Sequence, residues 1–344
     1  MWAFFHKKRV VALGICIIAV CSSFSLSDVC TTSANGTASE AKAECVMELH
    51  SRRILYEKQG DIRLPMASTT KIATAITVLE NCKDITAEFP IPAEAEGVEG
   101  SSVYLKSGDK YSVEDLLYGL MLRSGNDCAT ALALHCCGSI QDFSAKMNKT
   151  AQRAGALNTC FKNPHGLPCE GHYTTARDLN LISCYAMENS TFRKIVATKY
   201  YEPRHWKNKN KMLHVYEGGI GVKTGYTKEA GRCLVSAAQR EGMTLICTVL
   251  SCSTTYERSI ELLNDAFSCY SNVKLLDKNE KIEVLNDTKK IITQAREEFV
   301  YPIMEGEMEQ IERRIIPSND KEIVGQIQIW LSKRLLFSTN LYKL

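Results

Sequence analysis

The sequence lacks a strong excess of either charge: 42 Lys and Arg residues face 39 Asp and Glu residues, for a formal net charge of +3. A general nucleic-acid-binding protein carries a basic excess or a basic stripe, so this balance argues against nucleic acid as a partner. No Cys-x-x-Cys pair occurs, which leaves a zinc site with little support, and we expect neither metal nor cofactor. The 45% apolar and 24% charged residues are typical of a globular protein with a sizeable core.

A long hydrophobic run is also missing. Residues 10–20 are apolar, but a membrane-spanning helix needs about 20 such residues. The run follows basic residues at 6–9 and precedes small and polar residues at 21–25, which is the layout of a secretory signal peptide. We therefore expect residues 1–27 to be a signal peptide, with an uncleaved anchor as the less favoured alternative. The protein is then exported and acts outside the cytoplasm.

Cysteine, by contrast, is abundant, with 15 residues in the chain. Export permits disulfides, yet several cysteines, such as Cys128 and Cys247, lie inside apolar helix or strand patterns. We expect most of them to be small buried apolar side chains, with one or two disulfides allowed. Their pairing does not follow from the sequence.

The pattern of apolar residues divides the rest of the chain into three parts. Residues 28–44 are rich in Ala, Ser and Thr and predict a mobile linker. From 45 to 270 the order is strands, many helices, more strands and a closing helix. This order indicates an α+β domain whose antiparallel sheet is assembled from both ends of the segment. From 271 to 344 short apolar runs alternate with charges, which predicts a small all-β domain.

Individual elements follow from spacing and capping signals. In the α+β domain we expect a β-hairpin at 46–57, a helix at 69–81, helices starting at Ser139 and at Thr174 or Thr175, strands at 234–238 and 243–250, and a helix at 257–268. In the last part we expect strands at 281–285, 311–316, 323–329 and 335–338.

The first of three chemical motifs, Ser68-Thr-Thr-Lys71, opens the predicted helix at 69–81. Three residues apart on a helix, the two side chains share one face. A serine hydroxyl becomes a good nucleophile when a neighbouring base takes its proton. A lysine amine can do so if burial or a second cation lowers its pKa. The alternative is that Ser68 only caps the helix, but the strongly apolar helix that follows favours a rigid catalytic position.

The second motif, Ser124-Gly125-Asn126, lies between two helical patterns. We expect Gly125 to permit a tight turn that aims both flanking side chains the same way. The Ser124 hydroxyl could then relay protons to a leaving amine, and the Asn126 amide could hold the Lys71 amine and a substrate carbonyl. The alternative is an ordinary helix–helix turn, because Ser, Gly and Asn are common turn residues.

The third motif, Lys223-Thr224-Gly225, looks like the start of a strand. Its ammonium and hydroxyl groups can bind a terminal carboxylate, and Gly225 lets an extended peptide pair along the strand edge. Lys223 could also be the second cation beside Lys71. The alternative is an ordinary strand with a solvated lysine. The basic stretch 207–211 just before it predicts a solvated loop in which substrate contact is possible.

The three motifs occur in this order, each in a suitable local context, so a chance match of all three is improbable. Together they describe an acyl-transfer site with a nucleophile, a base, a relay and a carboxylate anchor. Such a site needs no Asp or His, so a Ser-His-Asp triad built on His165 or His172 is unnecessary. We expect both histidines to be loop residues with structural hydrogen bonds.

The neighbourhoods of the motifs, residues 65–72, 122–127 and 221–227, resemble the low-molecular-mass penicillin-binding proteins. Within that family the closest group is the serine-type D-alanyl-D-alanine carboxypeptidases, which segments 163–167 and 172–178 also resemble. The resemblance implies a transpeptidase-like fold, with a five-stranded antiparallel sheet flanked by helices and a helical subdomain. The tail resembles the small all-β domain that follows in this family.

The resemblance also implies roles for these residues. Ser68 would attack the bond between two D-alanines of a peptidoglycan stem pentapeptide and form an acyl-enzyme that water hydrolyses. Lys71 would act as base, and Ser124 would pass the proton to the leaving D-alanine. Backbone N–H groups of Ser68 and Tyr226 would form the oxyanion hole, and Lys223 with its neighbouring threonine would hold the terminal carboxylate. β-Lactams would mimic the substrate and acylate Ser68.

Some features depart from the family pattern and leave alternatives. Many members end in an amphipathic helix that binds the membrane. The sequence up to Leu344 shows no such helical pattern. Membrane association remains an expectation, but not through a C-terminal amphipathic helix. An Arg that aids carboxylate binding often precedes the closing helix. Arg258 lies nearby, but the sequence does not fix its register. A weak β-lactamase, an endopeptidase acting on cross-links and a non-catalytic wall-binding protein are alternatives. The intact Ser68, Lys71 and Lys223 argue against the last.

Overall fold

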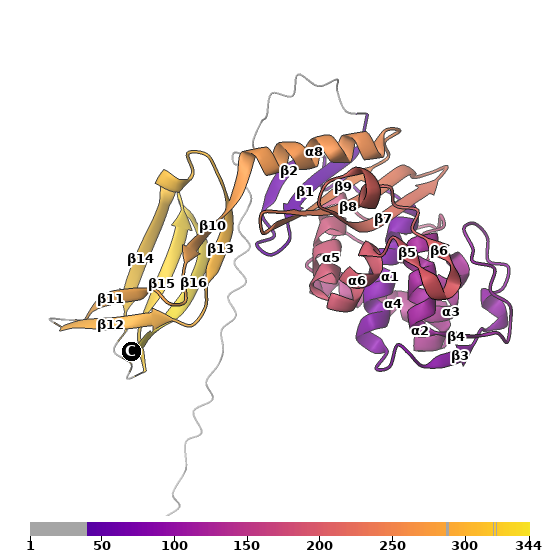
Figure 1. Ribbon diagram of the computed structural model, residues 1–344, viewed down its shortest axis with the longest axis horizontal. Helices are drawn as coiled ribbons and strands as arrows, with labels where there is room; N and C mark the ends of the chain where they lie inside the picture. Colours follow the sequence, from indigo (N-terminus) through magenta and orange to yellow (C-terminus); the bar gives the residue numbers. More distant parts are fainter. Residues whose placement is uncertain (1–39, 287–288, 319, 321) are drawn as a thin grey trace, which may run out of the picture.

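The computed structural model describes residues 40–286, 289–318, 320 and 322–344, and the expected signal peptide and most of the expected linker lie outside them. A five-stranded antiparallel sheet with the order β2-β1-β9-β8-β7 forms the centre of the larger part (Figure 1). Its strands are β1 (Ala43–Glu48), β2 (Ile54–Lys58), β7 (Gly219–Thr227), β8 (Gly231–Arg240) and β9 (Met243–Leu250). Because β1 pairs directly with β9, the sheet joins both ends of the segment, as predicted.

Helices cover both faces of this sheet (Figure 1). α8 lies on one face, and α1, α5 and α6 lie on the other, with α2, α3 and α4 packed beyond them. The helices are α1 (Lys71–Asn81), α2 (Val113–Tyr118), α3 (Asn126–Cys137), α4 (Ile140–Arg153), α5 (Ala176–Glu188), α6 (Ser190–Ala197), α7 (Met212–Val215) and α8 (Thr255–Cys269). Two short ladders pair β3 (Glu88–Pro90) with β4 (Lys110–Ser112) and β5 (Tyr200–Tyr201) with β6 (Trp206–Lys207).

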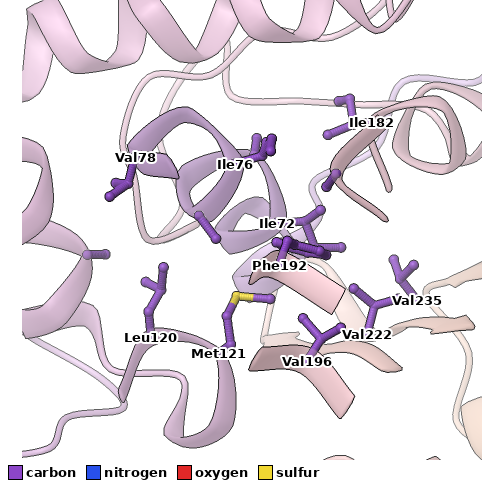
Figure 2. Close-up of a cluster of buried hydrophobic side chains, with 14 of the residues drawn as sticks. Ile72, Ile76, Val78, Leu120, Met121, Ile182, Phe192, Val196, Val222 and Val235 are labelled. Atoms are coloured by element: carbon purple, nitrogen blue, oxygen red, sulfur yellow. The ribbon is translucent and has the colours of Figure 1, made fainter. Parts of the chain in front are cut away.

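The helix α1 is the centre of the main hydrophobic core. All its residues from Lys71 to Val78 are buried. Ile72 and Ile76 belong to one buried cluster with Ile182 of α5, Phe192 of α6 and Val222 of β7 (Figure 2). Burial of each isoleucine stabilises the fold by about 1.5–3 kcal/mol. The helix forms where the sequence pattern predicts it, and its enclosure holds its N-terminal end in a fixed position.

Two helix starts confirm their capping signals. The Ser139 hydroxyl accepts a hydrogen bond from the backbone N–H of Asp142, at 3.0 Å, at the start of α4. Thr175, rather than Thr174, accepts from Asp178 N at 3.0 Å and begins α5. Each oxygen satisfies a backbone donor that has no partner within the helix.

The C-terminal all-β part contains a five-stranded sheet of order β11-β12-β16-β15-β14 and a pair, β10-β13. Its strands are β10 (Tyr270–Leu276), β11 (Lys281–Asn286), β12 (Lys289–Ala295), β13 (Phe299–Met304), β14 (Ile311–Pro317), β15 (Ile323–Leu331) and β16 (Arg334–Lys343). The four predicted strands are present. The other three, β10, β12 and β13, were missed because their short apolar runs alternate weakly and are stabilised by pairing with distant strands.

The first strand begins earlier than the sequence indicates. β1 starts at Ala43, inside the stretch 28–44 that predicts a linker, because Ala43 pairs with Leu250 of β9 and is buried. A stretch rich in Ala carries little strand signal of its own, and the pairing with β9 decides its conformation. Among the residues that the structure describes, no helix is long and apolar enough to cross a membrane.

The cysteines only partly match their prediction. All 12 cysteines in the described part of the chain are free thiols, and six are buried, Cys128 and Cys247 among them. Five more are half-buried and one is exposed. The prediction that most cysteines are buried therefore holds for half of those that the structure describes.

Candidate active site

Ser68 lies on a single 3₁₀ turn, Ala67–Thr70, that leads directly into α1. No side chain caps α1 or this turn, so the alternative that Ser68 is a helix cap is wrong. Its hydroxyl oxygen is 3.0 Å from the Nζ atom of Lys71. The side chain of Ser68 is half-buried and that of Lys71 is fully buried, which is the arrangement of a reachable nucleophile with a sheltered base.

Lys71 Nζ lies within hydrogen-bonding distance of three oxygen atoms. Besides Ser68 Oγ, these are Asn126 Oδ1 and the backbone oxygen of His165, each at 2.7 Å. Burial, and next the positive charge of Lys223, hold the pKa of Lys71 well below its ordinary value. Because the neutral amine is favoured in such surroundings, Lys71 is able to take a proton from the neighbouring hydroxyl.

The turn at Ser124 differs in detail from its prediction. Ser124 itself adopts the left-handed conformation, with φ of 66°, and it ends a π-helical turn, Gly119–Arg123. Gly125 has φ of −60°, so it does not supply the turn's unusual backbone angle. It supplies space, because a Cβ there would lie 2.7 Å from Asp127 Oδ1 and 2.9 Å from Cys128 Sγ. The segment is therefore not an ordinary helix–helix turn.

Asn126 and Asp127 fasten a loop beside the site. Asn126 Nδ2 donates to the backbone oxygen of Glu99 at 2.6 Å. Asp127 Oδ2 accepts from the backbone N–H groups of Val103 and Leu105, at 3.0 and 3.2 Å. The three motifs do not predict this role of Asp127, although a carboxylate directly after the second motif is a signal for it in the sequence. The loop in turn holds the Asn126 amide, which is oriented toward Lys71.

The third motif lies in the middle of β7, not at its start, because the strand begins at Gly219. Lys223 is buried, and its Nζ donates to the backbone oxygen of Thr224 at 2.9 Å. Burial, with the charge of Lys209, lowers the pKa of Lys223 to about 7. Lys223 is therefore not the solvated lysine of the alternative interpretation. Thr224 beside it is half-buried.

Gly225 brings β7 against the Ser68 turn. A Cβ at this position would lie 3.0 Å from the backbone oxygen of Met66 and 3.1 Å from the backbone nitrogens of Ser68 and Thr69. Any side chain here would push the strand and the turn apart. The next residue, Tyr226, has 65% of its surface exposed. The close approach places the backbone N–H of Ser68 beside the strand that carries the N–H of Tyr226.

Lys209 adds a third ammonium group close to the first two. Its charge contributes to the lowered pKa values of both Lys71 and Lys223. The side chain is exposed, as expected for a basic loop, but the backbone is anchored, since Lys209 N donates to Leu122 O at 3.1 Å. The side chain of Asn208 is also buried here. In this loop the lysines at 207 and 209 are exposed and the asparagines at 208 and 210 are buried. The alternation of Lys and Asn in the sequence indicates this alternation of exposed and buried positions.

The histidines do not form a triad with Ser68. His172 Nε2 lies 2.9 Å from Thr70 Oγ1, and its Nδ1 accepts from the N–H of Lys162 at 3.0 Å. Burial lowers the pKa of His172 to about 4, and burial and next the charge of Lys71 lower that of His165 to about 3. Both rings are neutral with structural contacts, which confirms the expectation. Arg258, which lies near the position of the carboxylate-binding arginine of the family, instead donates to the buried Glu44 at 2.8 and 2.9 Å.

These observations describe a serine hydroxyl, a buried lysine amine, a second serine and a strand that carries a buried cation. Such a set supports acyl transfer through a covalent serine intermediate. Among the residues that the structure describes, no group of three or more His, Cys, Asp or Glu side chains is arranged to hold a metal ion.

Comparison with known proteins agrees with this chemistry. A family model described as D-alanyl-D-alanine carboxypeptidase matches residues 29–254. The D-alanyl-D-alanine carboxypeptidase DacF of Bacillus subtilis is 33% identical over 306 residues, which is 83% of this chain and 78% of that protein. The D-alanyl-D-alanine carboxypeptidase of Streptomyces sp. strain K15 is 38% identical over 240 residues, or 62% of this chain and 82% of that protein.

Solved structures share the architecture. Penicillin-binding protein 5 from Haemophilus influenzae has a TM-score of 0.75 and 27% identity, covering 90% of this chain and 98% of that one. The Streptomyces K15 DD-transpeptidase has a TM-score of 0.61 and 38% identity, covering 67% of this chain and 98% of that one. The family model spans more than half of the chain and includes all three motifs. The chain therefore belongs to the D-alanyl-D-alanine carboxypeptidase family of serine peptidases.

Proposed function

We propose that this enzyme removes the terminal D-alanine from peptidoglycan stem pentapeptides through an acyl-enzyme on Ser68. The observation that carries the proposal is the position of Lys71 Nζ, 3.0 Å from Ser68 Oγ and 2.7 Å from Asn126 Oδ1 in a buried setting. A base held this close can take the hydroxyl proton as the oxygen attacks the carbonyl carbon.

Proton transfer to the leaving group is the next step. As the bond to the terminal D-alanine breaks, the leaving amine needs a proton, and we assign its delivery to Ser124. Asn126 is hydrogen-bonded to Lys71 and to the backbone oxygen of Glu99, and we assign to its amide the contact with a substrate carbonyl. Water then hydrolyses the acyl-enzyme and regenerates Ser68.

The developing negative charge requires preorganised donors. We assign these to the backbone N–H groups of Ser68 and Tyr226. The support is the close approach at Gly225, which brings β7 against the Ser68 turn. The substrate's own backbone would then extend along the edge of β7 in the manner of an added strand.

Recognition of the terminal carboxylate is assigned to Lys223 and Thr224. Lys223 is buried, and it is close enough to Lys209 for the two positive charges to repel each other. A negatively charged carboxylate bound near both ammonium groups would relieve this repulsion. A carboxylate therefore restores the charge of Lys223 on binding. β-Lactams carry the same carboxylate beside a reactive amide, so they would acylate Ser68.

Members of this family act on peptidoglycan, so the enzyme acts outside the cytoplasm. We propose that residues 1–27 direct its export, that 45–270 form the catalytic domain and that 271–344 form a separate β domain. We also propose that residues 28–44 include a linker and that the enzyme can associate with the membrane.

Covalent labelling with fluorescent penicillin tests the nucleophile. The wild-type protein is expected to carry the label, and Ser68→Ala is expected to lose it; persistent labelling of a folded Ser68→Ala variant would overturn the assignment. Incubation with a stem pentapeptide and with a cross-linked dimer then identifies the reaction. Free D-alanine from the pentapeptide supports a carboxypeptidase, whereas cleavage of the dimer alone indicates an endopeptidase.

A further inference from the structure

Two cysteines lie against each other at the end of the helical region that is remote from the active site. Cys82 follows the last residue of α1, and Cys136 is in the last turn of α3. Their sulfur atoms are 3.1 Å apart although 54 positions separate them in the sequence. Both residues are half-buried, so a reagent in solution can reach the pair.

The surroundings favour reaction of this pair. A disulfide bond has a length of about 2.05 Å, so the sulfur atoms need to approach by only about 1 Å more. The Cys136 thiol hydrogen-bonds to Cys82, and this bond, together with the positive charge of Lys146, lowers the pKa of Cys82. Lys146 is held nearby, because its Nζ donates to Asn81 Oδ1 at 3.0 Å. The thiolate is the reactive form of cysteine, so Cys82 is the better nucleophile of the two.

We propose that Cys82 and Cys136 form a disulfide bond that ties the ends of α1 and α3 together. The oxidant is a disulfide compound, such as the small or protein disulfides of oxidising compartments. The Cys82 thiolate attacks one sulfur of the oxidant and expels a thiolate, forming a mixed disulfide. The Cys136 thiolate then attacks Cys82 Sγ and expels the second thiolate. The two protein thiols lose two protons and two electrons, and the oxidant becomes two thiols.

The bond acts on the same two helices that carry the candidate site. α1 begins at Lys71 and α3 begins at Asn126, and these residues are joined at 2.7 Å. Each helix is about 16–18 Å long at 1.5 Å per residue. The disulfide therefore fastens the opposite ends of a helix pair whose first residues already touch. It also closes a long loop, which restricts the unfolded chain.

The experiment uses the purified full chain, reduced and then incubated with glutathione disulfide. Free thiols are alkylated, and the protein is digested without reduction and mapped by mass spectrometry. We expect a cross-linked peptide pair containing Cys82 and Cys136, with a mass two hydrogens below the sum of the reduced peptides. We also expect the oxidised protein to melt roughly 5–10 °C higher than the reduced protein.

Two cysteine variants test whether the cross-link depends on Cys136. Cys136→Ser should leave Cys82 free to be alkylated or capped by glutathione and should abolish the increase in Tm. Cys160→Ser, which removes another half-buried thiol, should leave the cross-link and the increase unchanged. Full alkylation of both residues in the oxidised wild-type protein, or pairing of Cys82 with Cys137 instead of Cys136, would overturn the proposal. The peptide map of the wild-type protein distinguishes these outcomes even if a variant fails to fold.

Discussion

Arg53 and Glu307 form a bidentate ion pair that joins the loop between β1 and β2 to the C-terminal all-β part. The exposed fractions of the two side chains are only 5% and 10%. The Arg53 guanidinium also donates to the backbone oxygen of Pro302 at 2.6 Å and lies over the rings of Tyr270 and Tyr301. A single arginine from the sheet edge is therefore surrounded by groups from β10, β13 and the turn after β13.

We expect Arg53→Ala to loosen the C-terminal part from the catalytic part. It leaves the Glu307 carboxylate buried without its partner, which destabilises by about 3–5 kcal/mol. Thermal unfolding should start at a lower temperature, and limited proteolysis should cut near Tyr270, while penicillin labelling of Ser68 persists. Arg52→Ala is the matched control, because Arg52 pairs with the exposed Glu188 and such pairs contribute about 0–1 kcal/mol. Equal effects of the two variants would contradict the prediction.

The same pair predicts loss of stability in acid. Burial raises the pKa of Glu307, but the hydrogen bonds from Arg53 outweigh burial, so the pKa falls below its ordinary value of 4.5. The stabilisation is complete above that value and is lost as the pH falls through the lower pKa of the folded state. The difference in Tm between wild-type protein and Glu307→Gln should therefore shrink as the pH is lowered below 4.5.

The two buried lysines predict a bell-shaped pH profile for kcat/KM. The acid limb reports loss of the proton from Lys71, whose pKa is well below 10.5. The alkaline limb begins near pH 7, where Lys223 loses the charge that binds the carboxylate. Release of D-alanine from a pentapeptide, followed across pH, measures both limbs.

The variant Lys223→Arg tests whether Lys223 is the group whose titration produces the alkaline limb. An arginine stays charged at all accessible pH values, so this limb should disappear from kcat/KM even if overall activity falls. An alkaline limb that is unchanged in Lys223→Arg would show that another group titrates there.

We expect Lys223→Met to be more stable than the wild-type protein near pH 7. Burial lowers the folded-state pKa of Lys223 below its ordinary value of 10.5. Lys223 therefore binds a proton more tightly in the unfolded chain than in the folded protein, and protonation favours unfolding. This destabilisation is greatest below pH 7 and decreases between pH 7 and 10.5. Calorimetry should show a Tm increase of about 2–5 °C at neutral pH. Lys106→Met, at an exposed lysine, should show little change.

Gly225→Ala should slow acylation without unfolding the protein. The added Cβ meets Met66 O and Ser68 N at 3.0–3.1 Å, so β7 and the nucleophile turn must separate slightly. Misplacement by about 1 Å can reduce a rate about 10²-fold. The penicillin acylation rate measures the effect. Gly138→Ala is the control for backbone strain alone, because Gly138 at the end of α3 has φ of 73° but its added Cβ would meet no other atom. An equal loss of acylation there would refute the explanation.

Lys209→Ala tests the exposed cation. We expect KM for the pentapeptide to rise several-fold, with a smaller change in kcat, because a uniform binding contact is lost. Removal of this charge should also raise the pKa of Lys71 and move the acid limb to higher pH. Lys207→Ala, at an exposed position two residues earlier, should change neither quantity. A change in KM without any shift of the acid limb would place Lys209 too far from Lys71.

The sequence by itself determined the local elements and the chemical groups. Ser139 and Thr175 mark helix starts because a side-chain oxygen bonds within one turn. Ser68 and Lys71 come together for the same reason, since three helical positions bring their side chains to one face. These interactions depend on neighbouring residues only, so the sequence contains all the information that they require.

Only the tertiary structure decided the features that join distant segments. Ser124, not Gly125, takes the left-handed conformation, and Gly125 instead leaves space for Asp127 and Cys128, which a Cβ there would meet. Arg258 turns to Glu44, since a buried carboxylate on β1 requires a partner. The low pKa of Lys71 likewise needs both its burial on α1 and the charge of Lys223 on β7. Burial and electrostatic coupling are properties of the packed chain, and a linear motif does not contain them.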